Sequence, residues 1–363
     1  MSAASGTSGR PTYAQSRLLL GTCNVGFWVC VAVACLVWNL PAQLFSTEVL
    51  FGKSLALALA TFLLGYVALQ APFDLMGGYI LPALYRRHSE GFGGFVISWV
   101  RGVLVQTLVL FGIGWTLVSY SEWLAGLVAG WMLVLLLLQS LVARAVGYFH
   151  LRGGVGWKSL DEAFTGGFVG LPFAQKAIFA TGRGQRLRQM DERRRLYLQR
   201  MRLPLAGLVI ALAYNVVGVL VVQSAVVHPL NTMSGLVELA LWFTLWSFLG
   251  LLVLPSLSRR AVYAGDYALY SNGIRGEEFA YYLDHDRSQA DEESRSGWVE
   301  SIFHPVPSPQ NRAARWGKRP AWAGGWHAAR YAIYLSWAGL SLLNRSVHCN
   351  IGKPNVWVML PCE

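Results

Sequence analysis

The stretch MSGLVELALWFTLWSFLGLLVLP, residues Met233 to Pro255, decides how this chain folds. It contains one charged residue, Glu238, and a helix needs roughly 20 apolar residues to cross the hydrocarbon core of a bilayer. The stretch that follows it, SLSRRAVYAGDYAL, is polar and basic. We therefore predict a helix that crosses the membrane and leaves it at Pro255.

Five more apolar runs are nearly free of charge, which predicts six spans in all. The chain of 363 residues is 54% hydrophobic and 13% charged, with a mean hydropathy of +0.41, and this composition is typical of membrane proteins. The five runs are Gly21 to Phe45, Ser54 to Leu69, Gly102 to Tyr120, Leu124 to Ala143 and Leu203 to Val227. Another run, Tyr331 to Leu343, is shorter, so we expect it to lie on the membrane or to pack on the cytosolic part.

The 30 basic residues indicate the orientation, because Lys and Arg near the ends of spans stay on the cytoplasmic side. Only Lys53 falls in a loop on the other side of a six-span arrangement. We therefore expect a multi-pass protein with both termini cytoplasmic, in a bacterial inner membrane. The net charge of +11 favours contact with the lipid bilayer, and no basic and aromatic module indicates a nucleic acid partner.

These boundaries divide the chain into an N-terminal tail (1–20), four membrane helices (21–143) with a basic loop at 72–101, and a cytosolic segment (144–202). A pair of membrane helices (203–255) and a cytosolic C-terminal segment (256–363) follow. The expected fold class is an all-α polytopic membrane protein with a cytosolic α-rich unit built from two segments.

Common catalytic motifs are missing from the sequence. The seven histidines are too far apart to form HExxH, which places two imidazoles on one helix face. The stretch TGRGQR lacks the residues that complete a phosphate-binding loop, and no GxSxG elbow occurs. The five cysteines form no CxxC pair, so we expect them to be unpaired.

A few residues nevertheless form a pattern. Ser258, Arg259 and Asp266 match three positions of the motif SRxxExxAD, and the stretch FHPVPSPQNR supplies His304 and Arg312 further on. With these residues the chain resembles the integral-membrane HExxH zinc metallopeptidases, the group of the CAAX prenyl endopeptidase and the heat-shock protease HtpX. The resemblance implies a cytosolic metallopeptidase-like unit.

The same resemblance implies that the zinc site is lost. Val262 stands where the family has its glutamate ligand, and Gly265 replaces an alanine. The zinc helix would fall in QMDERRRLYLQRMRLPL, where Asp191 and Glu192 are the only acidic residues and no histidine occurs. A catalytic zinc needs three protein ligands, so we predict no catalytic residues, no metal and no other cofactor.

The sequence therefore favours a catalytically inactive, metallopeptidase-like protein that serves as a binding or scaffold subunit for a membrane protein or peptide. One alternative is a membrane-embedded zinc metallopeptidase with a non-standard site, rebuilt from Asp191, Glu192, Asp266 and His304. Another is a small-solute transporter, because Glu238 is an ionisable group within a span and such groups are often functional.

Overall fold

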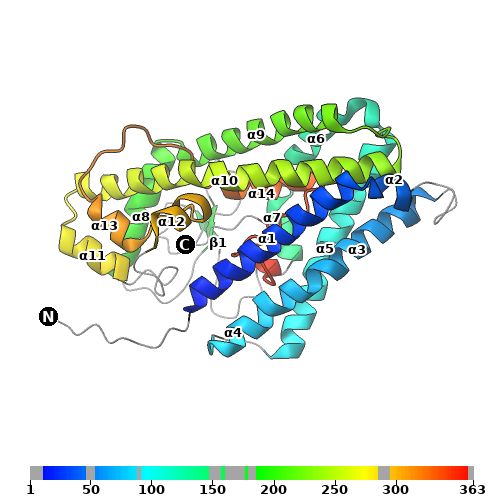
Figure 1. The fold of residues 1–363 in the computed structure, drawn as a ribbon. Helices are drawn as coiled ribbons and strands as arrows, with labels where there is room; N and C mark the ends of the chain where they lie inside the picture. Colours follow the sequence, from blue (N-terminus) through cyan, green and yellow to red (C-terminus); the bar gives the residue numbers. More distant parts are fainter. Residues whose placement is uncertain are drawn as a thin grey trace.

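The computed structural model describes residues 11–45, 54–87, 91–146, 157–159, 176–178, 185–284 and 295–358. These residues are largely helical, as the sequence predicts, and the arrangement is shown in Figure 1. Two three-residue strands, β1 (Trp157–Ser159) and β2 (Lys176–Ile178), pair antiparallel, with Trp157 opposite Ile178. Most of the expected segment 144–202, and the first ten residues of the expected tail, lie outside the described residues.

Within the described ranges, five helices are long and apolar enough to cross a membrane, so the chain is a multi-pass membrane protein. They are α1 (Tyr13–Val37), α3 (Leu55–Leu75) with its continuation to Leu84, α5 (Phe92–Ser119), α9 (Leu203–Ala225) and α10 (Met233–Ser271). The remaining expected span is shorter than predicted. A 3-10 turn (Ser121–Trp123) and α6 (Leu124–Leu137) form one apolar helix, and α7 (Gln139–Ala145) follows after a break at Leu138.

Helix ends differ from the expected span ends because local capping fixes them. The first helix begins at Tyr13 because Thr12 and Gln15 form a capping box, in which each side chain accepts a hydrogen bond from the other's backbone. It ends before Asn39, whose φ of 51° breaks the helix, and the short α2 (Leu40–Phe45) follows. The second span continues past Pro72 into a π-helical turn (Met76–Ile80) and α4 (Leu81–Leu84).

The helix α10 does not end at Pro255, as the sequence suggested, but continues to Ser271. A proline within a helix removes one donor and one hydrogen bond. Packing against α8 (Gln185–Arg200), α9 and α12 (Gly297–Phe303) offsets this loss. The residues Ser258 to Asp266 therefore lie on a rigid helix rather than on a loop.

A helical cap surrounds this C-terminal half of α10 (Figure 1). It consists of α8, α11 (Gly276–Asp284), α12 and α13 (Pro309–Ala314). Its own small core includes Leu269, Phe279 and Leu283, and the Phe279 ring stacks on Trp316 with 4.0 Å between centroids. The cap lies in the two parts of the chain where the sequence predicts the α-rich unit.

The run near the C-terminus differs most from expectation. Residues 326–346, which include α14 (Ala328–Leu335) and a 3-10 turn (Ser336–Gly339), are nearly all buried and pack against α6, α9 and α10. The amide of Asn215 donates to Ala332 O, and Thr244 Oγ1 accepts from Leu342 N. Both partners lie within the apolar parts of α9 and α10, so residues 326–346 pack inside the helix bundle, and we call them the re-entrant segment.

A re-entrant segment within a bundle can be short and irregular because protein, not lipid, surrounds its backbone. Length and hydropathy therefore did not identify it. The expectation that Tyr331–Leu343 lies on the membrane surface or packs on the cytosolic part is corrected accordingly.

Candidate functional site

Two of the residues that the sequence singled out, Asp266 and Arg312, meet in a buried ion pair. Arg312 donates to Asp266 through both Nε and Nη2, at 2.9 Å from Oδ2 and 2.8 Å from Oδ1. Arg194 approaches the same carboxylate, with its Nε 3.5 Å from Oδ1. All three residues are at most 3% exposed. We call Asp266, Arg312 and Arg194 the Asp266 cluster.

Three elements of the cap position the cluster. Asp266 lies on α10, Arg312 on α13 and Arg194 on α8, so the ion pairs join three helices. Gly265 allows the Arg194 side chain to lie close to α10, because a Cβ at position 265 would lie 3.0 Å from both Cγ and Nε of Arg194. The replacement of the family's alanine by Gly265 thus fits the presence of this arginine. Arg194 was not among the predicted residues, and only its place on the helix of Asp191 pointed to it.

The remaining motif residues lie outside the Asp266 cluster. Arg259 does not bond to Asp266; its Nη1 donates to the carbonyls of Glu300 and His304, at 2.9 and 3.0 Å. Val262 is 1% exposed and belongs to the apolar interior. Ser258 is also buried, at 2%.

His304 lies against a second histidine rather than in the Asp266 cluster. Its ring centroid is 5.5 Å from that of His348. Burial, followed by the fields of His348, Arg295 and Arg259, lowers the pKa of His304 to about 2. The imidazole is therefore neutral at physiological pH.

The geometry offers little to a metal ion. Among the described residues, no group of three or more His, Cys, Asp and Glu side chains could hold one. Asp191 and Glu192 lie on α8, but their side chains are outside the described part of the structure. The carboxylate of Asp266 is already engaged by two guanidinium groups, which would have to leave before it could bind a metal.

Glu238, the intramembrane acid, caps a turn. Its carboxylate accepts hydrogen bonds from the backbone amides of Val227 and His228, at 3.1 and 3.0 Å, and contacts His228 Nδ1 at 2.8 Å. These contacts join the end of α9 to the first turns of α10. Glu238 therefore stabilises the connection between two spans.

A second buried carboxylate, Asp74, was missed by the sequence reasoning. It accepts hydrogen bonds from Trp99 Nε1 at 2.9 Å, Gln70 Nε2 at 3.2 Å and Gly352 N at 3.0 Å, and it forms an ion pair with Arg345. Asp74 and Arg345 are both fully buried. We call these five residues the Asp74 network.

Aromatic rings surround Arg345. Its guanidinium carbon lies 4.5 Å from the ring centroid of Trp357, 5.5 Å from that of Tyr66 and 5.9 Å from that of Trp99. Such cation–π contacts help to stabilise a charge that is removed from water. The only sequence signal was an aspartate just beyond the predicted second span, and the distance of 271 residues to Arg345 concealed their pairing.

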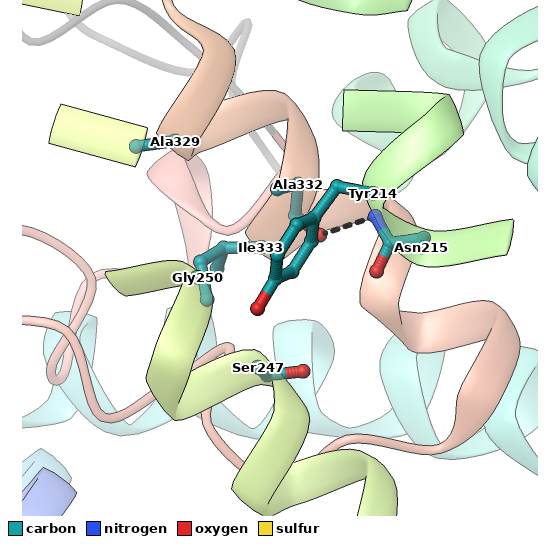
Figure 2. Close-up of a pocket in the computed structure, with 7 residues that line it drawn as sticks. All are labelled: Tyr214, Asn215, Ser247, Gly250, Ala329, Ala332 and Ile333. Carbon is teal, nitrogen blue, oxygen red and sulfur yellow. Dashed lines mark hydrogen bonds between the residues drawn. The ribbon is translucent and has the colours of Figure 1, made fainter. Parts of the chain in front are cut away.

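Figure 2 shows a crevice between α9, α10 and α14. Its lining is made of small, apolar or hydrogen-bonded groups, including Tyr214, whose hydroxyl donates to Trp246 O at 2.6 Å. The crevice is too narrow for a water-sized molecule. The re-entrant segment thus fills the space between these helices.

Comparisons of the chain with protein-family models, with characterised proteins and with solved structures find no match. The resemblance to membrane metallopeptidases therefore stays a prediction from the residues quoted above.

Proposed function

We propose that this protein is a catalytically inactive, metallopeptidase-like membrane protein that acts as a binding or scaffold subunit. The observation that carries the proposal is the Asp266 cluster. A carboxylate held by Arg312 in two hydrogen bonds, with Arg194 beside it, serves to join helices. Val262, at the position of a zinc ligand in the family, is packed in the interior.

The packing supports a partner site on the outer surface of the protein. The re-entrant segment occupies the interior between α6, α9 and α10, so a partner is expected on an outer surface rather than in a cavity. Large aromatic side chains are exposed on the cap, above all Trp298, which is 81% exposed on the first turn of α12. Exposed aromatic residues are enriched at protein interfaces.

Metal analysis tests the inactive state. We expect purified, folded protein to contain no stoichiometric zinc after equilibration with zinc and removal of the excess. The active alternative predicts one zinc per chain, lost on His304→Ala, together with cleavage of a peptide library. Stoichiometric zinc that His304→Ala abolishes would overturn the inactive reading.

Site-specific crosslinking tests the binding surface. A photoreactive amino acid at Trp298 is expected to yield one discrete crosslinked product in cells, and the same group at Arg200, exposed on α8, serves as the matched control. Equal labelling patterns at both positions would contradict a specific surface on α12.

The Asp74 network favours the transporter alternative, which therefore has a test of its own. Buried ionisable groups within spans are a usual feature of ion and proton pathways. Transport predicts that protein in liposomes dissipates an imposed pH gradient, read with an internal pH-sensitive dye, and that Asp74→Asn stops the flux. Liposomes that hold the gradient with unmodified protein exclude proton transport.

A further inference from the structure

The pair His304 and His348 lies where separate segments of the chain meet. His304 follows α12, while His348 follows the re-entrant segment and packs on α1, where a Cβ at Gly21 would lie 2.6 Å from the His348 Cβ. His304 is only 8% exposed, and its Nε2 has no hydrogen-bond partner within the described part of the chain. Buried polar atoms are rarely left without a partner, so this atom points to a ligand or a water.

Positive charge surrounds the two rings. Arg17 holds the carbonyl of His348 through Nε at 3.1 Å and Nη2 at 2.6 Å, and Arg259 holds the carbonyl of His304 at 3.0 Å. The cations whose fields act on the two rings come from several segments: Arg17, Arg259, Arg295, Arg330 and Lys353. Burial and then these charges lower the pKa of His348 to about 3.

Among the described residues, the acidic side chain next to this group is Glu300, and it is already engaged. Glu300 accepts hydrogen bonds from Ser308 N at 3.0 Å and Asn311 Nδ2 at 2.9 Å. Two imidazoles could in principle ligate a metal, but the surrounding cations oppose a further positive charge. The same field attracts an anion, and an oxygen acceptor would satisfy the buried Nε2.

We propose that His304, His348 and the arginines around them form a site for a phosphate-bearing anion, either an anionic lipid headgroup or a small free phosphate. The site lies near the start of α1 and beyond Pro255 on α10, where two spans approach the expected cytoplasmic boundary. Basic pockets between membrane helices on that side commonly hold phosphorylated headgroups. The inference goes beyond the scaffold function and does not depend on it.

Binding is expected to be coupled to protonation. An anion beside His304 stabilises the imidazolium, whereas the charges of His348, Arg295 and Arg259 disfavour it in the free protein. Among the described residues, Asp266 on α10 is held by Arg312, and Glu300 on α12 accepts hydrogen bonds from Ser308 and Asn311. The anion therefore binds more tightly as the pH falls.

The test uses full-length protein with isotope-labelled histidine in phosphatidylcholine nanodiscs, followed by NMR of the imidazole rings. One arm adds inorganic phosphate, and the other replaces part of the lipid with phosphatidylglycerol in a phosphate-free buffer. A shift with phosphate identifies a free phosphate site, and a shift only with phosphatidylglycerol identifies a headgroup site. No saturable shift in either arm overturns the proposal.

Variants localise the binding. His304→Gln and Lys353→Gln are each expected to weaken binding about tenfold or more, measured by titration of the responsive ligand. Lys353 is only partly buried, so its variant guards against misfolding of the His304 variant. Arg200→Gln, which removes an exposed charge on α8, should leave the affinity unchanged. Unaltered affinity in both site variants, or an equal loss in Arg200→Gln, overturns the proposal.

Discussion

Single residues in this protein show how buried carboxylates are held by arginines. Asp266 accepts two hydrogen bonds from Arg312, and Asp74 pairs with Arg345 at a site from which water is excluded. Removing one partner of a buried pair leaves an uncompensated charge, which costs more than the pair itself contributes. Both pairs are therefore sensitive points for stability.

Arg312→Ala is expected to destabilise the protein by about 3 to 5 kcal/mol, because Asp266 would keep only Arg194 beside it. The loss is measured as a lower midpoint of thermal unfolding in detergent. Arg319→Ala removes an exposed charge from the loop that follows α13 and serves as the control. Similar midpoints for the two variants would show that the Asp266 cluster does not hold the cap together.

The pH dependence of stability follows from His304. Its pKa in the folded protein, about 2, lies below the value of roughly 6.5 in an unfolded chain, so the unfolded state binds the proton first. Stability is therefore full above about pH 6.5 and is lost as the pH falls, by up to about 1.4 kcal/mol per unit. As the pH is lowered from about 7.5 to 5 in phosphate-free buffer, the unfolding midpoint of His304→Gln should fall less than that of the unmodified protein. An identical slope in the variant would contradict this assignment.

At the scale of elements, the apolar runs predicted five of the long helices because a bilayer demands a minimum length. Their ends could not be predicted, since α1 begins at a capping box and α10 is carried past Pro255 by its neighbours. The sequence did not predict the re-entrant segment. Surrounding protein can satisfy the hydrogen bonds of its backbone, so the segment needs no long apolar run.

For the candidate site, the sequence identified some of the residues but not how they pair. The sequence named Asp266 and Arg312 in separate stretches and suggested Arg259 as the ion-pair partner of Asp266, whereas in the structure Asp266 pairs with Arg312 and Arg194. The Asp74 network depends on a contact between distant parts of the chain, and a single sequence contains no signal for such a pairing.

Glycine packing tests the re-entrant segment. A Cβ at Gly207 on α9 would collide with the carbonyl of Trp326, so Gly207→Ala should cost about 1 to 3 kcal/mol by overpacking. Gly65→Ala on α3 is the matched control, because a Cβ there meets nothing within 4 Å. The readouts are the unfolding midpoint and the rate at which a protease removes the C-terminal segment. Equal behaviour of both variants would argue against the packing of α9 on Trp326.

For the whole molecule, the distribution of charge implies a topology that the helices alone do not fix. Five long helices would place the ends of the chain on opposite sides, whereas an additional crossing by residues 121–137 places them on the same side. The basic residues favour the second arrangement, with the cap in the cytoplasm.

Thiol labelling can distinguish these arrangements. In a background without native cysteines, Asn231→Cys between α9 and α10 should react with a membrane-impermeant reagent added to intact cells. Lys318→Cys, exposed on the cap, should react only after the membrane is permeabilised. The opposite pattern would reverse the predicted orientation.

The re-entrant segment also constrains how the protein is made. Residues 326–346 follow all five long helices in the chain, so the ribosome synthesises them after those helices. Until then Asp74, Asn215 and Thr244 lack the partners that this segment brings, namely Arg345, Ala332 and Leu342. These three contacts can therefore form only after the five long helices have been synthesised. A deletion of residues 326–346 is therefore expected to impair assembly of the whole bundle.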